Sequence, residues 1–176
     1  MDEKRVALFV DVQNIYYTTR QVFNSHFDYN AFWALVSKGR QVTKAIAYAI
    51  DRGDPRQRQF QDILRAIGFE VKLKPFIQRS DGTAKGDWDV GITLDVMSWA
   101  PKVDMVALAS GDGDFDLLLQ KVRQDFGLHT EVYGVEALTA SSLIQVSDHF
   151  IPITHDLLLP IRKTKKNSQE DVTNTI

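Results

Sequence analysis

The 176-residue chain carries 44% hydrophobic residues, which suits one compact domain with its own core. Its formal net charge of −2 argues against binding of nucleic acid through bulk positive charge alone. Cysteine is absent, which excludes disulfide bonds and thiolate metal ligands. Neither an apolar run of about 18 residues nor a secretion signal is evident, so we expect a cytoplasmic protein that does not span a membrane.

Strands and helices alternate in the predicted fold. In chain order, the patterns predict a strand over 5–11, helices over 14–23 and 30–38, a strand over 42–50, a helix over 54–69, a strand over 70–77, a loop over 78–86, a helix over 87–100, a strand over 103–110, a helix over 113–127, a strand over 128–135, a helix over 139–148 and a last strand over 150–153. We expect one domain over 1–160 and a polar, disordered tail over 161–176.

This alternation implies a three-layer, doubly wound α/β fold with a mainly parallel sheet. Because crossovers in such sheets are right-handed, we expect the Rossmann-like strand order 3-2-1-4-5, with the first and fourth strands side by side. Asp11 ends the first strand and Asp112 follows the fourth. Ligands of open α/β sheets bind at the carboxyl ends of the strands where the order reverses, so both carboxylates are expected in one crevice.

Two acidic segments contribute further carboxylates. LASGDGDFDLLLQKV (108–122) holds Asp112, Asp114 and Asp116 before a helix that is expected to bury Leu117, Leu118 and Val122. KGDWDVGITLDV (85–96) holds Asp87, Asp89 and Asp95 in a helix so apolar that we expect it to be buried on more than one side. Asp87 is also explained as a helix cap and Asp89 by the helix dipole, and a hydrogen bond from a Tyr or Lys would satisfy Asp95.

Aspartates that meet without cysteine or histidine ligands suit a hard cation, Mg²⁺ or Mn²⁺. The four histidines lie outside the acidic segments, and we interpret them as packing or surface residues. Mg²⁺ typically takes one or two carboxylates together with phosphate oxygens of a substrate. The sequence therefore predicts metal-dependent chemistry on a phosphate group.

Three other motifs do not fit. A calcium loop that starts at Asp112 needs Gly and Glu where Leu117 and Arg123 stand. A phosphomonoesterase of the haloacid-dehalogenase type needs an aspartate two residues after Asp11, where Gln13 stands. The GDGD sequence lacks the G-x-G-x-x-G spacing of dinucleotide-binding proteins.

The acidic motifs resemble those of the NYN domain proteins, the LabA-like branch of the PIN-like nuclease superfamily, over residues 5–153. ALFVDVQNIYY is similar to the first-strand motif of the family and supplies Asp11 and Asn14. ALASGDGDFDLLL is similar to its Ser-Gly-Asp-x-Asp-Phe motif and supplies Ser110, Asp112 and Asp114.

Two further segments carry the same resemblance. KGDWDVGITLDV is similar to the Lys-Gly-x-Asp-x5-Asp segment of the family and supplies Lys85, Asp89 and Asp95. One extra residue before Asp89 leaves Asp87 as an alternative for its role. ASSLIQVSDHFIPI resembles the closing segment, with Ser147 where alanine is usual. Three spaced motifs in the right order make the resemblance specific.

The resemblance implies a PIN-like fold and a metal-dependent ribonuclease site. It assigns four residues as ligands of Mg²⁺ or Mn²⁺ and catalytic groups: Asp11, Asp89, Asp112 and Asp114. Asn14 joins the catalytic set by orienting a carboxylate or a phosphate oxygen. The supporting residues are Asp95, Asp116, Ser110 and Lys85.

We therefore expect hydrolysis of phosphodiester bonds in single-stranded or structured RNA. The residues expected to follow the nucleic-acid backbone are Arg52, Arg56, Lys74, Arg79 and Lys85. The alternative is a nucleic-acid- or protein-binding regulatory module of the same fold that barely cleaves. RNA against DNA, endo- against exonucleolytic cutting, one metal against two, and the oligomeric state stay open.

Overall fold

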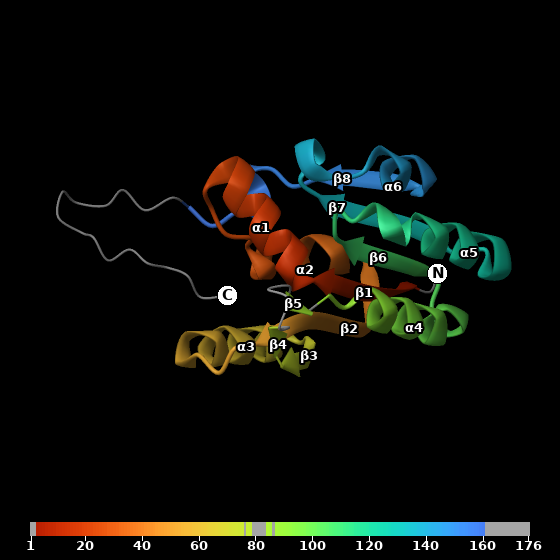
Figure 1. Cartoon of the computed structure of the whole chain (residues 1–176). Helices are drawn as coiled ribbons and strands as arrows, with labels where there is room; N and C mark the ends of the chain where they lie inside the picture. The colour runs from red at the N-terminus through yellow and green to blue at the C-terminus, as the bar shows by residue number, and fades with distance from the viewer. Residues whose placement is uncertain (1–2, 76, 79–83, 86, 161–176) are drawn as a thin grey trace.

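The computed structural model describes residues 3–75, 77–78, 84–85 and 87–160, and a six-stranded parallel sheet runs through its centre (Figure 1). The strands are β1 (Lys4–Asp11), β2 (Arg40–Asp51), β3 (Glu70–Pro75), β6 (Met105–Ala109), β7 (His129–Gly134) and β8 (His149–Pro152). Their order is β3-β2-β1-β6-β7-β8, and each neighbouring pair is parallel. The predicted α/β fold and its strand order are confirmed, with β8 added at the edge.

Helices cover both faces of the sheet. They are α1 (Val12–Phe23), α2 (Tyr29–Ser37), α3 (Pro55–Ile67), α4 (Asp89–Trp99), α5 (Asp116–Phe126) and α6 (Ser141–Val146). Short 3-10 turns occupy Ala100–Lys102, Gly113–Phe115, Glu136–Leu138 and His155–Leu157. Within the described ranges, no helix combines the length and the apolar character needed to cross a membrane.

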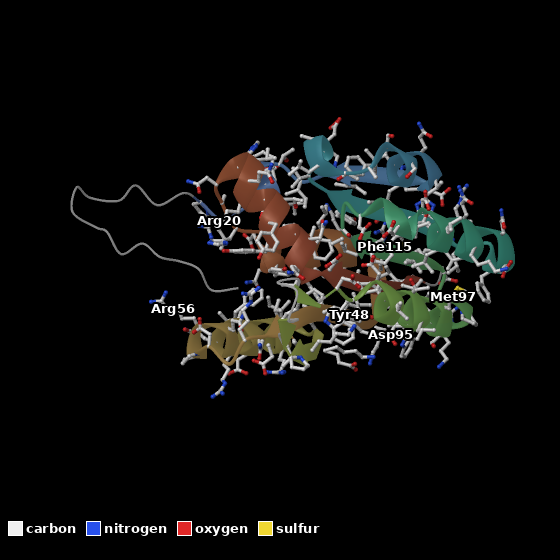
Figure 2. The ribbon with its side chains drawn as sticks, viewed as in Figure 1. Arg20, Tyr48, Arg56, Asp95, Met97 and Phe115 are labelled. Carbon is white, nitrogen blue, oxygen red and sulfur yellow. The ribbon has the colours of Figure 1, made fainter. Side chains whose placement is uncertain are left out.

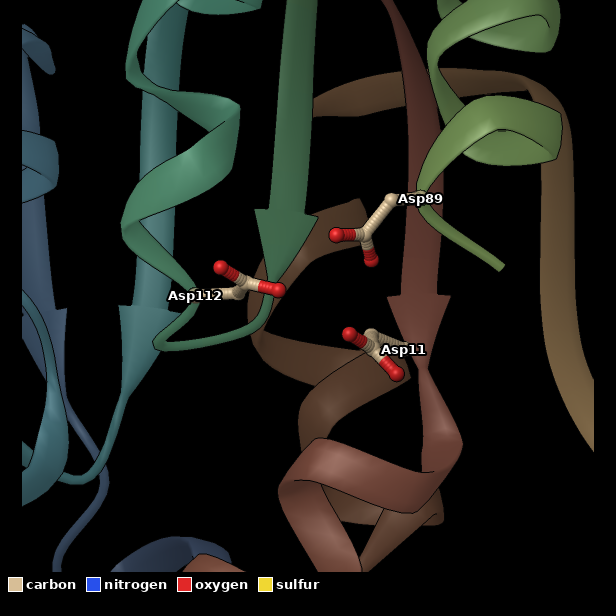
Figure 3. Close-up of side chains that lie close together, drawn as sticks. All are labelled: Asp11, Asp89 and Asp112. Carbon is tan, nitrogen blue, oxygen red and sulfur yellow. The ribbon is translucent and has the colours of Figure 1, made fainter. Parts of the chain in front are cut away.

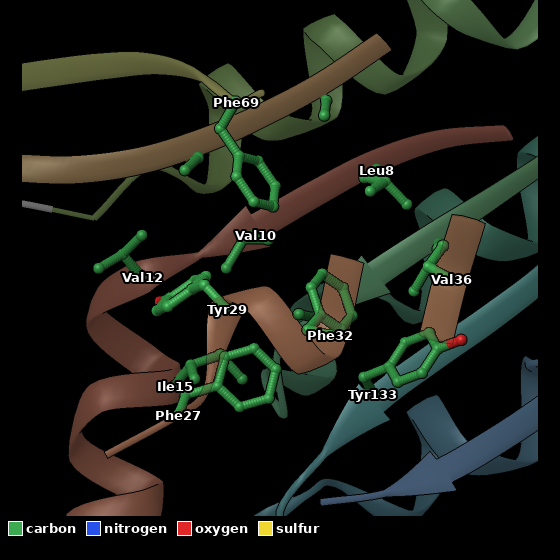
Figure 4. Packing of buried hydrophobic residues seen from close by; sticks show 14 of the residues in the cluster. Leu8, Val10, Val12, Ile15, Phe27, Tyr29, Phe32, Val36, Phe69 and Tyr133 are labelled. Carbon is green, nitrogen blue, oxygen red and sulfur yellow. The ribbon is translucent and has the colours of Figure 1, made fainter. Parts of the chain in front are cut away.

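Strand β1 shows how the layers form, because Val6 to Val10 are completely buried. Val6, Leu8 and Val10 point into a core with α1, α2 and α3. Ala7 and Phe9 point to the other face, into a core with α4, α5 and α6. Alternate side chains of a strand point to opposite faces, so a continuous apolar run is what a sheet covered on both faces requires. Figure 4 shows the first of these cores, where Phe32 and Tyr133 meet edge to face.

Helix α3 forms where its boundary signals predict it. Asp54 is the N-cap, and its side chain accepts the backbone N–H of Arg56 at 2.8 Å. Pro55 occupies the first helical position, where no N–H is needed. Gly68 ends the helix with φ of +135°, a conformation that side chains other than glycine rarely adopt.

Three expectations about local structure are wrong. The predicted loop contains a small antiparallel pair, β4 (Ile77–Gln78) with β5 (Ala84–Lys85), which is too short to produce a sequence period. Helix α4 is buried on one side only, since Val90 and Leu94 are 70% and 63% exposed. Leu117 is 72% exposed, because a 3-10 turn precedes α5 and turns Leu118, Leu119 and Val122 to the core instead. The predicted tail over 161–176 lies outside the described residues.

Candidate metal centre

Three aspartates meet at the carboxyl edge of the sheet, where the strand order reverses between β1 and β6. Asp11 is the last residue of β1, Asp112 follows β6 by three residues, and Asp89 begins α4. The chain leaves β1 toward α1 on one face and leaves β6 toward α5 on the other. This divergence opens the crevice in which doubly wound sheets bind ligands.

The three carboxylates point toward one another (Figure 3). One oxygen from each of Asp11, Asp89 and Asp112 lies within 4.8 Å of the other two. Asp11, Asp89 and Asp112 are each partly buried. In the part of the chain that the structure describes, this is the group of acidic and histidine side chains whose spacing suits a metal ion.

Backbone and side-chain hydrogen bonds hold the two strand ends in register. Asn14 accepts the backbone N–H of Gly111 through Oδ1 at 2.8 Å, which ties α1 to the turn after β6. The buried Ser110 hydroxyl donates to Oδ2 of Asp11 at 3.2 Å and accepts the backbone N–H of Asp112 at 3.1 Å. Asn14 and Ser110 therefore fix the relative positions of Asp11 and Asp112.

The turn after β6 also demands a glycine. A Cβ atom at Gly111 would lie 2.8 Å from the backbone oxygen of Leu138, closer than such atoms approach in proteins. Glycine at this position lets the loop before α6 close over the strand end. Each residue of the Ser-Gly-Asp sequence thus has a physical role. Ser110 links the two strand ends by hydrogen bonds, Gly111 allows the close approach of the neighbouring loop, and Asp112 is a candidate metal ligand.

Burial and mutual repulsion raise the proton affinity of these carboxyls. Burial, with smaller contributions from the charges of Asp112 and Asp87, raises the pKa of Asp11 to about 6, against the lowering effect of the Asn14 and Ser110 hydrogen bonds. Burial and then the neighbouring Asp112, Asp87 and Asp11 raise the pKa of Asp89 to about 7. Among the ion pairs of the described residues, none includes Asp11, Asp89 or Asp112.

The other predicted acids occupy different positions. Asp114 is exposed in the 3-10 turn, its backbone N–H donates to Asp112 Oδ1 at 2.9 Å, and it does not belong to the group of three. Asp116 begins α5. Asp87 is exposed and accepts the backbone N–H of Asp89 at 3.4 Å, so the structure brings Asp89 rather than Asp87 into the group.

Asp95 lies outside the group and has the partners that a partly buried carboxylate on an apolar helix requires. Its Oδ2 accepts from the Tyr48 hydroxyl at 2.7 Å and from Lys72 Nζ at 2.8 Å (Figure 2). Tyr48 is completely buried on β2, and this contact raises its pKa after the larger effect of burial. Asp95 therefore fastens α4 onto β2 and β3, which supports Asp89 through the helix rather than by contact. The sequence gives no sign of Tyr48 or Lys72 as its partners, because strand pairing brings them together.

The predicted basic residues divide between the helix α3 side and the entry to α4. Arg52 and Arg56 are exposed near the start of α3. Lys74 donates from Nζ to the backbone oxygen of Asp87 at 2.9 Å, and its Nζ lies 4.5 Å from the Trp88 ring centre, in the segment that precedes Asp89 in the chain. Arg79 lies outside the described residues, and Lys85 belongs to β5, whose side chains are not described.

A doubly wound sheet with converging aspartates at its switch point defines a PIN-like domain. Residues 5–157 match the family model of the NYN domain, and the chain belongs to that family. The chain is 28% identical over 170 residues to the Low amplitude and bright protein LabA of Synechococcus elongatus, covering 92% of this chain and 90% of that protein. It is 54% identical to a protein of unknown function from Vibrio parahaemolyticus, whose crystal structure superposes with a TM-score of 0.86 and covers 89% of this chain and 97% of that one. The expected family is confirmed.

Proposed function

We propose that this protein hydrolyses phosphodiester bonds of RNA with Mg²⁺ or Mn²⁺ held by Asp11, Asp89 and Asp112. The observation that carries the proposal is the convergence of three carboxylates from three separate elements within 4.8 Å of one another. Like charges at this distance repel, so the group destabilises the fold unless a cation binds there and offsets the repulsion. Membership of the NYN family, a group of nuclease-like domains, supports the choice of a phosphodiester substrate.

The donor set fits a hard divalent cation. All three groups offer oxygen, and Mg²⁺ and Mn²⁺ prefer oxygen ligands. Burial, together with the neighbouring carboxylates, raises the pKa values of Asp11 and Asp89, and a bound cation would lower both. Such an ion supplies an activated water and neutralises charge on the phosphoryl group.

The side chains around the group have positioning roles in this proposal. Ser110 and Asn14 keep the Asp11 and Asp112 carboxylates aimed at one point, so that binding needs no rearrangement. Asp114, the fourth predicted ligand, and Asp116 lie outside the group of three carboxylates and are proposed to hold water rather than the phosphate. Lys74 brings positive charge to the segment that precedes Asp89 and is proposed to contact a backbone phosphate, as are Arg52, Arg56, Arg79 and Lys85.

The test is cleavage of single-stranded RNA with Mn²⁺ by the parent, by Asp112→Asn and by Asp125→Asn. The Asp112→Asn change keeps the acceptor for the Asp114 N–H but removes a charged ligand, so the cleavage rate should fall at least about 100-fold. Asp125 forms an exposed pair with Lys121 on α5, and the same substitution there should leave the rate unchanged. A parent that binds RNA but shows no Mn²⁺-dependent cleavage would favour the binding module instead.

A further inference from the structure

A second feature lies at the same edge of the sheet, on the opposite face from α4 and α5. It is a groove of about 650 Å³ between α1, the end of β2 and α3. Its lining begins with Val12 and Gln13, the two residues that follow Asp11 in the chain. In Figure 2, Arg20 of the groove wall and Arg56 at the start of α3 lie on the same side of the molecule. Sites that hold a nucleotide-sized molecule have volumes of roughly 300–1,000 Å³.

Helix α3 turns two glutamines to its buried side, where an amphipathic helix normally has apolar residues. Its buried positions are Gln57, Gln61 and Leu64, which share one helical face. Gln57 is 6% exposed, and its Oε1 accepts the backbone N–H of Arg52 at 2.8 Å. Gln61 is 5% exposed and lines the groove, yet its amide makes no hydrogen bond within the described part of the chain. Its amide atoms are not among the fully enclosed atoms that lack a partner, so the amide opens onto the groove, where a ligand can reach its donor and its acceptor.

Aromatic side chains also line the groove. Tyr16, Tyr17 and Phe60 line it, and Tyr17 is 51% exposed. The rings of Tyr16 and Tyr17 meet at 69° with centres 5.3 Å apart, so their faces point in different directions. An exposed tyrosine face is a platform on which an unpaired base stacks.

The charge of the groove favours an anion. Arg20 and Arg52 belong to its walls, and none of the described residues that line it is acidic. The acidic metal centre and this groove therefore share one edge of the sheet but have opposite electrostatic character. An amide, an aromatic face and guanidinium groups together match a base, its stacking surface and its phosphate.

We propose that this groove binds the base of an RNA nucleotide next to the scissile phosphate, with Gln61 hydrogen-bonded to the base edge and Tyr17 stacked on the ring. The inference rests on the proposed RNA hydrolysis for the identity of its substrate. A glutamine amide offers a donor and an acceptor side by side, which complements a base edge that presents the reverse pair. The groove then gives the enzyme a preference among bases that phosphate contacts alone cannot supply.

The experiment measures binding of fluorescent six-nucleotide RNAs in EDTA, where no metal-dependent cleavage interferes. Adenine, uracil and cytosine homopolymers are compared with an abasic oligomer of the same length. The variants are Gln61→Leu, Tyr17→Ala and the control Gln59→Leu, an exposed glutamine of α3 that does not line the groove. The parent should bind its best homopolymer at least tenfold more tightly than the abasic oligomer. Gln61→Leu and Tyr17→Ala should each remove most of that difference, and Gln59→Leu should keep it.

A thermal melt separates a structural from a binding role of Gln61. Leucine is close to glutamine in size and needs no partner, so Gln61→Leu should melt at or above the temperature of the parent. If it does not fold, the exposed Tyr17→Ala carries the binding test. Equal binding of base-containing and abasic RNA, or unchanged base preference in both variants, overturns the groove assignment.

The two proposals fail in distinguishable ways. If the parent cleaves RNA with Mn²⁺ while neither variant alters base preference, the groove assignment is overturned and the proposed function stands. If base-dependent binding is lost in both variants but no RNA is cleaved, the groove assignment stands and the proposed hydrolysis is overturned.

Discussion

Glu131 on β7 and the group of Asp11, Asp89 and Asp112 at the carboxyl edge of the sheet differ in whether partners within the fold balance their charge. Glu131 on β7 accepts two hydrogen bonds from the Arg40 guanidinium, at 3.0 and 2.9 Å, and one from the Tyr133 hydroxyl at 2.9 Å. Burial raises its pKa, but these partners outweigh burial and hold the pKa below its usual range. Asp11 and Asp89 have raised pKa values, and no ion pair within the described residues includes them.

The comparison separates a carboxylate whose charge is neutralised within the fold from carboxylates whose charge is not. In the Arg40–Glu131 pair the two charges neutralise each other, and we expect the pair to stabilise the folded protein. The aspartate group leaves charge unsatisfied at the switch point of the sheet, which is the pattern of a site arranged for a ligand at some cost to stability. The two groups can therefore be tested against each other.

The largest expected effect on stability comes from breaking the Arg40–Glu131 ion pair. Arg40→Met removes the cation and leaves the 7%-exposed Glu131 carboxylate without its main partner. We expect the free energy of unfolding to fall by about 3 kcal/mol, measured by urea denaturation. Arg5→Met is the control, because the Arg5–Asp104 pair is exposed and should leave the denaturation midpoint nearly unchanged. A midpoint equal to that of the parent in Arg40→Met would show that the pair contributes nothing.

A smaller effect of opposite sign is expected in the group of Asp11, Asp89 and Asp112. Without metal, Asp112→Asn removes one of three repelling charges and should stabilise the fold by about 1 kcal/mol. Mn²⁺ at about 100 times its dissociation constant should stabilise the parent by about 2.7 kcal/mol and Asp112→Asn much less. Thermal melts with Mn²⁺ and with EDTA measure both effects, and Asp125→Asn should melt as the parent does. Loss of stability in metal-free Asp112→Asn would instead identify a structural carboxylate.

The pH dependence of stability should separate the two groups further. A carboxyl with a raised pKa stabilises the fold at low pH, and this stabilisation is lost as pH rises through the folded pKa, here about 6 for Asp11 and about 7 for Asp89. Glu131 has a lowered pKa, so its contribution is present above its unfolded pKa and is lost as pH falls through the folded one. Melts in EDTA should thus show the parent gaining stability relative to Asp112→Asn between pH 8 and pH 5. Parallel curves for the two proteins would contradict the contribution of the Asp112 charge to these raised pKa values.

The same protonation should oppose metal binding. Ligand carboxylates must be ionised, so the Mn²⁺-induced rise in melting temperature should grow as pH increases from 5.5 to about 8. A shift that does not vary with pH over this range would place the ion on groups other than Asp11 and Asp89.

The smallest expected effect concerns the basic side of α3. Arg56→Glu should weaken RNA binding a few-fold and reduce the slope of log affinity against log salt by about 1. Arg65→Glu, on the last turn of the same helix, is the matched control and should change neither quantity as much. An unchanged slope in Arg56→Glu would remove this residue from the path of the nucleic-acid backbone.

The sheet and the meeting of Asp11 with Asp112 were predictable because they follow from rules that act on whole elements. A continuous apolar run such as 5–11 requires covering on both faces, and right-handed crossovers then fix the strand order. The exposure of Leu117 was not predictable in this way, because one 3-10 turn before α5 changes which side of the helix faces the core. A shift of one residue turns a helical side chain by about 100° around the axis without altering the composition of the segment.

Contacts between distant side chains were equally hidden in the sequence. The need of Asp95 for a Tyr or Lys partner was predictable from its apolar helix, but the choice of Tyr48 and Lys72 depends on the register of β2 and β3. Gln61 shows the reverse situation. The sequence itself shows a polar residue where the amphipathic pattern of α3 predicts an apolar one. The groove that Gln61 lines is visible only in the fold, because residues of both α1 and α3 form its walls.

The most direct test of the central claim is anomalous diffraction from crystals soaked in Mn²⁺, collected for the parent and for Asp112→Asn. We expect one strong anomalous peak in the parent between the carboxylates of Asp11, Asp89 and Asp112, and a weak or absent peak in the variant. A parent crystal with no peak at this position, or with a peak that Asp112→Asn leaves unchanged, would contradict it.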